Sequence, residues 1–273
     1  MKYADLHIHS NYSDGTMSPE EIINKAINLG VKSISITDHD SINSQYVTRN
    51  KYTNIKIIPG IELSTEFGDL ELHILGYFID INNEELINTV DKLSKARMRR
   101  VNEILLKLRE QDIELNIEDL DIDFNSTIGR SHVAKAMVRK GYYTNYKAAF
   151  TNHLIKGKKA YVKGYKLNYK EAIQIINNSG GVAVLAHPGQ IYKSLEVENI
   201  IKNLKFFGLK GLEVYHPSHS KDQTNNFYNL AKKYKLLITG GSDFHGKDGL
   251  KENSIGSYGI NEELLNKLIN LSK

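Results

Sequence analysis

Apolar positions along the chain follow two periods, one typical of strands and one typical of helices. Short apolar runs predict strands over residues 2–9, 31–40, 55–63, 70–78, 182–188, 211–217 and 236–245. Apolar residues three and four positions apart predict helices over 17–30, 84–111, 168–181, 195–208, 220–234 and 261–272. Strands that alternate with helices of this length are typical of βαβ units, whose strands run parallel in a sheet or barrel.

The best-marked helix follows the first predicted strand. Ser18 is placed to cap its N-terminus, Pro19 stands at the first helical position, and Glu21 completes a Ser-x-x-Glu capping box. Gly30 marks the end of this helix. The sequence EFGDL at 66–70 resembles the turn of a hairpin between the two strands that flank it.

A helical block interrupts the alternation. The long amphipathic pattern over 84–111 is followed by shorter helical patterns within roughly 131–156. We expect residues 1–82 and 168–273 to form one discontinuous α/β domain, and residues 83–167 to form a mainly helical insertion that caps it. Seven predicted strands favour a distorted (β/α)7 barrel over an open sheet, because polar residues gather at their C-terminal ends, where such barrels carry their sites.

Composition narrows the class of protein. The 273 residues are 40% hydrophobic and 25% charged, which is ordinary for a globular protein. The chain has no cysteine, so disulfides and thiolate metal sites are excluded, and any metal must be held by His, Asp and Glu. No apolar run approaches the roughly 18 residues of a membrane span, and the first residues lack the apolar core of a signal peptide. We therefore expect a cytoplasmic protein with no membrane partner.

Charge is distributed unevenly, although the net charge is only +4. Residues 130–170 hold 11 Lys or Arg and no acid, while residues 112–124 hold six acids and no base. We expect the acidic run to be a solvated face. For the basic segment, a surface that faces a polyanion is at least as well supported as a solvated face.

Histidines and carboxylates gather at the ends of the predicted strands. Seven of the ten histidines lie in or just after strands, namely His7, His9, His39, His73, His187, His216 and His245. Asp14, Asp38, Asp40, Glu62 and Asp243 lie around them. Each residue alone is a weak signal, but their recurrence at nearly every strand end predicts a metal site. Nitrogen and oxygen ligands suit Zn²⁺, Mn²⁺ or Fe²⁺, and so many candidates imply two or three ions.

Local spacing supports this prediction. His7 and His9 stand two apart on a strand, so both side chains face the same side. Asp243 and His245 have the same spacing and follow two glycines, which allow a close approach of the backbone.

Six ordered segments, DLHIHSNYSDG, ITDHDS, GIELST, ELHILGY, AHPG and GGSDFHG, resemble the motifs of the PHP (polymerase and histidinol phosphatase) family. The insertion after HILGY, with IGRSHVAKAMV inside it, resembles that of the trinuclear nucleotide-phosphatase branch. This resemblance implies a PHP-type barrel over nearly the whole chain. It also implies removal of phosphate from nucleoside 3′,5′-bisphosphates and monophosphates, and, as in some members, trimming of short RNA from the 5′ end.

The resemblance further implies three divalent metal ions, with Mn²⁺ favoured and Fe²⁺ or Zn²⁺ as alternatives. The implied ligands are His7, His9, Glu62 and Asp243 for the first ion, the bridging Glu62 with His73 and His187 for the second, and Asp14, His39 and His245 for the third. No ligand of the motifs is missing, which favours a working enzyme. In the expected reaction, a hydroxide that bridges the first two ions attacks phosphorus in line with the leaving oxygen, without a covalent intermediate.

Four further residues are candidates for substrate contacts. His216 and His219 are alternative proton donors to the leaving group, or else orient the substrate or support the structure. The resemblance implies that Arg130 clamps a substrate phosphate, which a planar guanidinium can contact through two bonds, and His132 is a second candidate. Tyrosines interleaved with lysine between 142 and 169 suit the stacking of a base.

The leading hypothesis is a metal-dependent phosphatase or phosphodiesterase that acts on nucleoside 3′,5′-bisphosphates, 5′-AMP or short RNA, with no obligate protein partner. One alternative is a histidinol phosphatase on the same barrel, but its small amine substrate gives no reason for a basic insertion. The other is a non-catalytic metal-binding accessory domain, such as the PHP modules attached to DNA polymerases. We rank it lower because this chain carries no polymerase.

Overall fold

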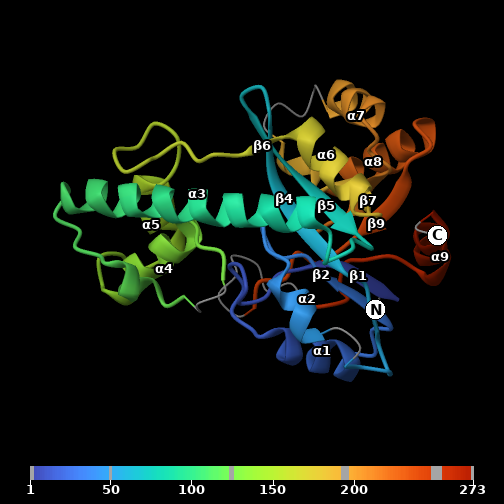
Figure 1. Cartoon of the computed structure of the whole chain (residues 1–273), viewed down its shortest axis with the longest axis horizontal. Helices are drawn as coiled ribbons and strands as arrows, with labels where there is room; N and C mark the ends of the chain where they lie inside the picture. The colour runs from blue at the N-terminus through green and yellow to red at the C-terminus, as the bar shows by residue number, and fades with distance from the viewer. Residues whose placement is uncertain (1–2, 49–50, 123–125, 192–196, 247–253, 272–273) are drawn as a thin grey trace.

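The structure is a computed structural model that describes residues 3–48, 51–122, 126–191, 197–246 and 254–271 (Figure 1). Among these residues the strands form two sheets. The smaller sheet is parallel, with the order β1 (Ala4–Ile8), β2 (Ser33–Ile36) and β3 (Lys56–Ile57). The larger sheet has the order β6 (Leu167–Asn168), β4 (Gly60–Phe67), β5 (Leu70–Tyr77), β7 (Val182–Leu185), β8 (Gly211–Tyr215) and β9 (Leu237–Gly240).

The α/β class is confirmed, whereas the two sheets do not close into the expected (β/α)7 barrel. Single bridges between Ile8 and Phe244 and between His39 and Glu62 bring the sheets together at their edges. The predicted strand 55–63 is in fact two strands, β3 and β4, in different sheets. Pro59 lies between them and has no N–H with which to continue the backbone pairing of β3. The larger sheet is mixed, since β5 runs antiparallel to both β4 and β7. The predicted hairpin turn between β4 and β5 is confirmed.

The predicted helices are present within the described residues, although the ends of two predictions, at 195–196 and 272, lie outside them. The α-helices are α1 (Pro19–Asn28), α2 (Asn43–Thr48), α3 (Glu84–Arg109), α4 (Arg130–Arg139), α5 (Tyr146–His153), α6 (Tyr169–Asn178), α7 (Val197–Phe206), α8 (Lys221–Lys233) and α9 (Glu262–Leu271). The short helix α2 and the 3-10 turns Ile117–Leu120 and Pro188–Gln190 were not predicted. Helix α1 begins with the predicted capping box of Ser18 and Glu21. No described helix is both long and apolar enough to span a membrane.

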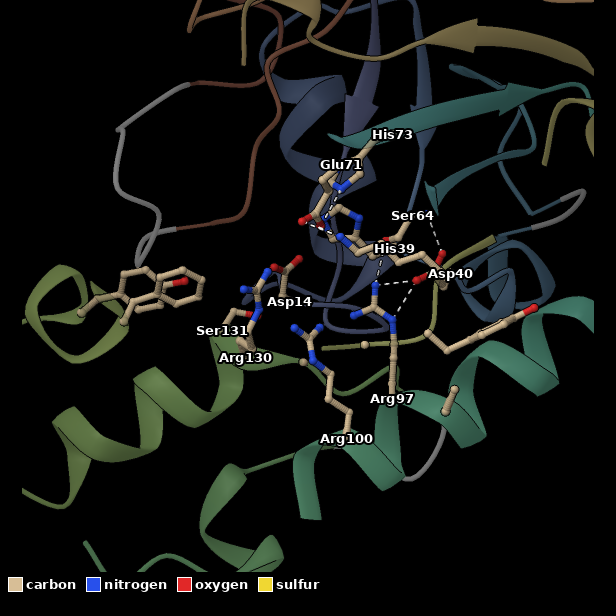
Figure 2. A pocket seen from close by; sticks show the side chains of 17 residues that line it. Asp14, His39, Asp40, Ser64, Glu71, His73, Arg97, Arg100, Arg130 and Ser131 are labelled. Carbon is tan, nitrogen blue, oxygen red and sulfur yellow. Dashed lines mark hydrogen bonds and ion pairs between the residues drawn. The ribbon is translucent and has the colours of Figure 1, made fainter. Parts of the chain in front are cut away.

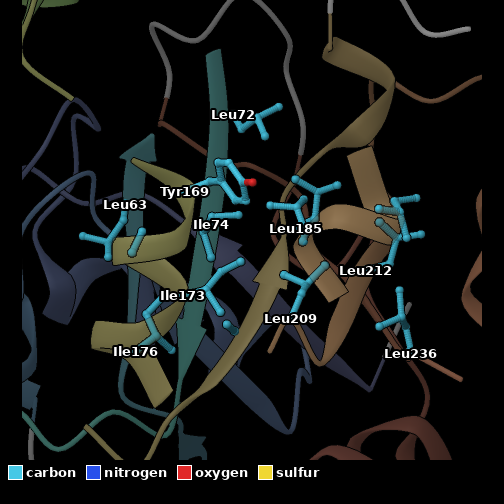
Figure 3. Packing of buried hydrophobic residues seen from close by; sticks show 14 of the residues in the cluster. Leu63, Leu72, Ile74, Tyr169, Ile173, Ile176, Leu185, Leu209, Leu212 and Leu236 are labelled. Carbon is cyan, nitrogen blue, oxygen red and sulfur yellow. The ribbon is translucent and has the colours of Figure 1, made fainter. Parts of the chain in front are cut away.

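The main core lies between the larger sheet and the helices that cover it. Ile173 and Ile176 of α6 pack on the sheet around Ile74 of β5, and Leu185 of β7 and Leu212 of β8 continue the same layer (Figure 3). This packing holds the strands rigidly, so that the residues at their ends keep fixed positions.

Helices α3, α4 and α5 extend to one side of the sheets (Figure 1). Ile104 and Leu108 of α3 pack with Val133 and Met137 of α4 in a hydrophobic cluster that is separate from the clusters of the sheets. These helices therefore have a core of their own beside the strand ends.

Candidate metal centre

The structure brings together all nine residues expected to hold metal. His7 lies on β1, Glu62 on β4 and His73 on β5, while the others follow strand ends or lie in the loops there. Four sets drawn from these nine residues have ligand atoms within 4.8 Å of one another: His9, Asp14, His39 and His245; His7, His9 and Asp243; His7, Glu62 and His187; and His39, Glu62 and His73. A fifth set joins His7 to Glu213 and His216, which were not among the expected ligands. These four sets share members, so the nine residues form one continuous cluster.

Glu62 lies at the centre of the cluster and is completely buried. Its Oε1 is 2.9 Å from Nδ1 of His73 and 3.0 Å from Nε2 of His187. Its Oε2 is 3.2 Å from Nε2 of His9 and 3.0 Å from Nδ1 of His39. The two oxygens of one carboxylate therefore face different sets of imidazoles, which is the arrangement that a bridging ligand requires.

Asp14 and His245 form the outer edge of the cluster. Asp14 Oδ1 is 3.2 Å from His245 Nε2 and 3.9 Å from His9 Nδ1. The rings of His9 and His245 stack with centroids 4.2 Å apart, and His9 and His39 are 4.5 Å apart. We call His9, Asp14, His39 and His245 the outer group.

Close packing of acids and imidazoles shifts their protonation strongly. Burial disfavours charge on His7, but the carboxylates of Glu213, Glu62 and Asp243 outweigh it and hold the pKa of His7 well above its usual value. Burial likewise opposes ionisation of Glu62, but the surrounding imidazoles, with His39 the strongest, hold the pKa of Glu62 well below its usual value. Without metal, the carboxylates therefore draw protons onto the rings, and metal binding must release those protons.

Several donor atoms in the cluster are left unsatisfied by protein groups. Oδ1 of Asp14, Nδ1 of His39 and Oε2 of Glu62 are buried and lie 3.0–3.2 Å from other polar atoms of the cluster, yet none of the three makes a hydrogen bond of ordinary geometry. Nε2 of His7 faces Nε2 of His9 at 3.1 Å, where only one proton fits between the two nitrogens. Converging lone pairs of this kind fit divalent cations, and oxygen and imidazole donors suit Mn²⁺, Fe²⁺ or Zn²⁺.

A pocket opens beside Asp14, His39 and His73, between the strand ends and helices α3 and α4 (Figure 2). Its basic residues are Arg97, Arg100, Arg130 and Lys166, and its aromatic residues are Tyr146, Phe150 and Tyr165. We call it the anion pocket. Only Arg130 and Lys166 come from the acid-free segment, whereas Arg97 and Arg100 come from α3. Sequence reasoning missed these two arginines, although their spacing of three places them on one helix face.

The cations of the anion pocket differ in how far the protein already satisfies them. Arg100 Nε donates to the carbonyl of Val162 at 2.9 Å, and burial beside Arg130 and Arg97 lowers the pKa of Arg100 to about 10. Arg130 donates to the carbonyl of Leu154 at 3.2 Å and lies over the ring of Phe150 at 5.4 Å. Lys166 is paired with Glu71. Arg100 and Arg130 therefore retain donors for an anion.

The three histidines named for substrate contacts have different surroundings. His132 Nδ1 accepts from the N–H of Gly129 at the start of α4, and burial lowers the pKa of His132. His219 Nδ1 donates to the carbonyl of Val214, and its Nε2 accepts from the N–H of Gly189. Burial lowers the pKa of His219 to about 4, so its ring is neutral near pH 7. The single ring proton and the single free lone pair are both used by backbone groups.

His216 keeps a nitrogen directed at the cluster. Its Nδ1 accepts from the N–H of Ser218 at 3.1 Å and lies 2.7 Å from the hydroxyl of the same residue, so we assign the proton of the neutral ring to Nε2. That Nε2 is 3.2 Å from Oδ2 of Asp243. His216 is thus oriented toward a candidate metal ligand, whereas His219 is not.

Comparison with known proteins assigns the family. The pattern that defines the PHP domain matches residues 5–215. The chain belongs to the PHP family. A 5′-3′ exoribonuclease of Haemophilus influenzae is 31% identical over 89% of this PHP chain and 90% of its own length. A 3′,5′-nucleoside bisphosphate phosphatase of Chromobacterium violaceum is 30% identical over 90% and 88%.

Two further relatives widen the range of chemistry. A phosphoribosyl 1,2-cyclic phosphate 1,2-diphosphodiesterase of Eggerthella lenta is 31% identical over 90% of this PHP chain and 95% of its own length. A solved structure from Bifidobacterium adolescentis, classed among metal-dependent phosphoesterases, is 27% identical, has a TM-score of 0.88, and matches 99% of this chain and 96% of its own. These similarities extend across the strand ends and the insertion alike.

One buried carboxylate behind the candidate ligands of this PHP domain was missed by sequence reasoning. Glu213, on β8, is completely buried, and its Oε1 is 2.9 Å from Nδ1 of His7. Its Oε2 accepts the backbone N–H of His187 at 2.7 Å. An acid inside the apolar strand GLEVY was the available signal. Such a carboxylate fixes the ring of a ligand and raises its basicity.

Asp5 and Asp38 play similar parts for neighbouring segments. Asp5 accepts the N–H of Ser242, next to Asp243, at 2.9 Å, and that of Gly256 at 2.7 Å. Asp38 accepts the N–H of Ser10, next to His9, at 2.7 Å.

These bonds hold ligands in uncommon backbone conformations. His187 has a φ of 23° and Asp243 a φ of 50°, values at which a side chain is strained. Only glycine fits at position 241, two residues before Asp243, because a Cβ on Gly241 would lie 2.3 Å from the Cβ of His7. The surrounding structure therefore determines the positions of the ligands in advance.

Proposed function

We propose that this PHP protein is a metal-dependent phosphoesterase that removes phosphate from nucleotides. Its expected substrates are nucleoside 3′,5′-bisphosphates and 5′-AMP, with trimming of short RNA from the 5′ end as a further activity. The observation that carries this proposal is the anion pocket beside the ligand cluster. A single phosphate on the metals leaves Arg100 and Arg130 free, so their charge favours a substrate with a second anionic group.

We propose three divalent ions, Mn²⁺ foremost, held by the nine clustered residues with Glu62 as the bridge. Bound there, such ions lower the pKa of a coordinated water toward 7 and neutralise charge on the phosphoryl oxygens. Glu213 holds the ring of His7, and Asp5 holds the segment before Asp243, so the ligands are oriented before substrate arrives.

The insertion supplies the groups that recognise the rest of the nucleotide. Residues 83–167 act as a cap over the PHP domain formed by residues 1–82 and 168–273, with its strands arranged as a distorted, incompletely closed barrel. Tyr146 and Phe150 stack with ring centroids 5.6 Å apart at the edge of the anion pocket, where a base can extend the stack. His132 supports the N-terminus of α4 and thereby the position of Arg130.

The leaving oxygen needs a proton, and His216 is the better placed of the two candidates. Its Nε2 proton is directed at the cluster, whereas the Nε2 of His219 accepts a backbone N–H and cannot donate. His219 supports the loop after β7 through Gly189.

The alternative substrates fit the anion pocket less well. Histidinol phosphate carries an ammonium group, which Arg100 and Arg130 repel. A non-catalytic role leaves both the complete ligand set and the cationic pocket unexplained. Since nucleotides and short RNA are cytoplasmic molecules, we propose that compartment for the protein.

The test measures phosphate release by the purified protein with Mn²⁺ from adenosine 3′,5′-bisphosphate, 5′-AMP, histidinol phosphate and a ribosyl cyclic phosphate. With 5′-phosphorylated short RNA, it measures release of mononucleotides. We expect the highest kcat/KM for the bisphosphate. His7→Ala and Asp243→Ala should abolish turnover while the protein stays folded by circular dichroism. Faster hydrolysis of histidinol phosphate or of the cyclic phosphate would overturn the nucleotide assignment.

A further inference from the structure

We propose that Arg97 is a positioning residue through which the insertion completes the outer group of metal ligands. The inference rests on the proposed metal centre and assigns the outer ion, unlike the others, to a site that the PHP domain and the insertion build together. It predicts that replacing one side chain of α3 lowers the affinity for the ion at the outer group and leaves the affinity for the other two ions unchanged.

Arg97 contacts the loop that carries His39 through the buried carboxylate of Asp40 (Figure 2). Its Nε and one terminal nitrogen donate to Oδ2 of Asp40 at 2.8 and 2.5 Å, and the same terminal nitrogen is 3.0 Å from Oγ of Ser64. Asp40 directly follows His39, is only 2% exposed, and has a φ of 51°. Its Oδ1 accepts the N–H of Ser64 at 2.8 Å.

This ion pair determines where the imidazole of His39 points. Asp40 adopts a left-handed conformation that a non-glycine residue rarely keeps unless it is held. Its own N–H donates to the carbonyl of Glu62 at 2.9 Å, so the turn is anchored beside the bridging carboxylate. Removing Arg97 leaves a buried, uncompensated carboxylate one residue from a metal ligand, which favours a rearrangement of that turn.

Two other residues of the insertion donate to backbone carbonyls of the outer group. Thr127 Oγ1 donates to the carbonyl of His39 at 2.8 Å. Lys135 Nζ donates to the carbonyl of Asp14 at 2.8 Å. Both carbonyls belong to residues of the outer group. A further link from the insertion to His73 is indirect, because Lys166 pairs with Glu71, and Glu71 lies 3.7 Å from Nε2 of His73.

The donors of Arg97 also distinguish it from an anion clamp. Its third nitrogen lies 3.4 Å from the carbonyl of Ile128, so all three nitrogens face protein acceptors. Arg100, one turn along α3, has only Nε so engaged among the described contacts. Arg97 therefore positions the loop, whereas Arg100 is free to bind the substrate.

The experiment is a titration of bound Mn²⁺ by equilibrium dialysis and elemental analysis of full-length wild-type protein, Arg97→Met, Asp40→Asn and the control Arg99→Met. Arg99 is an exposed neighbour on α3. Asn tolerates the left-handed conformation and keeps an oxygen for the N–H of Ser64, so Asp40→Asn removes the ion pair with little other change.

We expect three equivalents for the wild type and the control, and two tight equivalents for Arg97→Met and Asp40→Asn. The third should require about 10- to 100-fold more free Mn²⁺, the usual effect of losing a residue that orients a ligand. Anomalous scattering should assign the weakened ion to His39 and Asp14. At low Mn²⁺, kcat for the bisphosphate should fall with little change in KM, and excess Mn²⁺ should restore it.

Wild-type affinity for all three ions in both variants would overturn the inference, as would weakening of the ion at His73 and His187 or a wild type that binds only two ions. If Arg97→Met does not fold, Asp40→Asn alone decides. Metal binding is measured without substrate, so a wrong substrate assignment would leave this result unaffected.

Discussion

We predict that Arg100 strengthens substrate binding but lowers the free energy of unfolding of the protein. Its guanidinium is partly buried next to two other arginines, and its pKa falls well below its ordinary value, to about 10. A change of this size corresponds to about 3 kcal/mol of lost charge stabilisation at neutral pH. Because the pocket is open to solvent, which screens the charges, we take about half of this value. The charge of Arg100 then lowers the free energy of unfolding by roughly 1.5 kcal/mol.

The perturbation that isolates this charge is Arg100→Gln. The amide nitrogen of glutamine occupies nearly the position of the arginine Nε, so the hydrogen bond to the carbonyl of Val162 can be kept. We expect the melting temperature to rise by about 3–6 °C, at roughly 2–4 °C per kcal/mol for a chain of this size. The same change should lower kcat/KM for adenosine 3′,5′-bisphosphate by about 10- to 150-fold, because a charge-assisted contact is worth roughly 1.5–3 kcal/mol.

The assays are calorimetry or thermal denaturation with Mn²⁺ present, and steady-state hydrolysis of the bisphosphate beside p-nitrophenyl phosphate. Arg99→Gln, on the exposed face of α3, is the matched control. Added sulfate should raise the melting temperature of the wild type more than that of Arg100→Gln, since an anion stabilises the state that binds it. A variant that is less stable and still prefers the bisphosphate would refute the reasoning.

Three further outcomes are expected. Arg130→Ala should reduce kcat/KM about 10- to 150-fold for the bisphosphate but less than about 3-fold for p-nitrophenyl phosphate; an equal factor for both would place Arg130 on the reacting phosphoryl group. Glu213→Gln should weaken Mn²⁺ binding about 10- to 100-fold, with activity restored by excess metal, because Glu213 orients His7; unchanged affinity measured by titration would contradict this. His219 has a pKa of about 4 in the fold against about 6.5 unfolded, so the unfolded chain takes up a proton first and stability is lost as pH falls from 6.5 toward 4. His219→Gln should therefore lose about 2 kcal/mol less between pH 7 and pH 4.5 in urea unfolding of metal-free protein, and equal losses would contradict the assignment.

Local features of the chain could be predicted from the sequence because they depend on neighbours a few positions apart. The capping box of α1, the hairpin turn before β5 and the shared face of His7 and His9 each follow from spacing along one element. The ligand cluster was also within reach, because every strand end repeats the same kinds of donor. Resemblance to PHP motifs then grouped those donors into three sets, which stay a prediction.

Tertiary structure decided how these pieces fit together. Glu213 and His7 are 206 positions apart, and no periodicity connects an acid on one strand with a ring on another. Closure of the sheets depends on hydrogen-bond register between distant strands, which the alternation of helices and strands does not encode. For that reason the α/β class is confirmed, whereas the expected distorted (β/α)7 barrel is not. Arg97 and Arg100 look like ordinary surface charges of a long helix until that helix is laid against the strand ends. Asp40 then pairs with Arg97, and Arg100 is left with donors for an anion, because burial and the supply of nearby acceptors are properties of the folded surroundings.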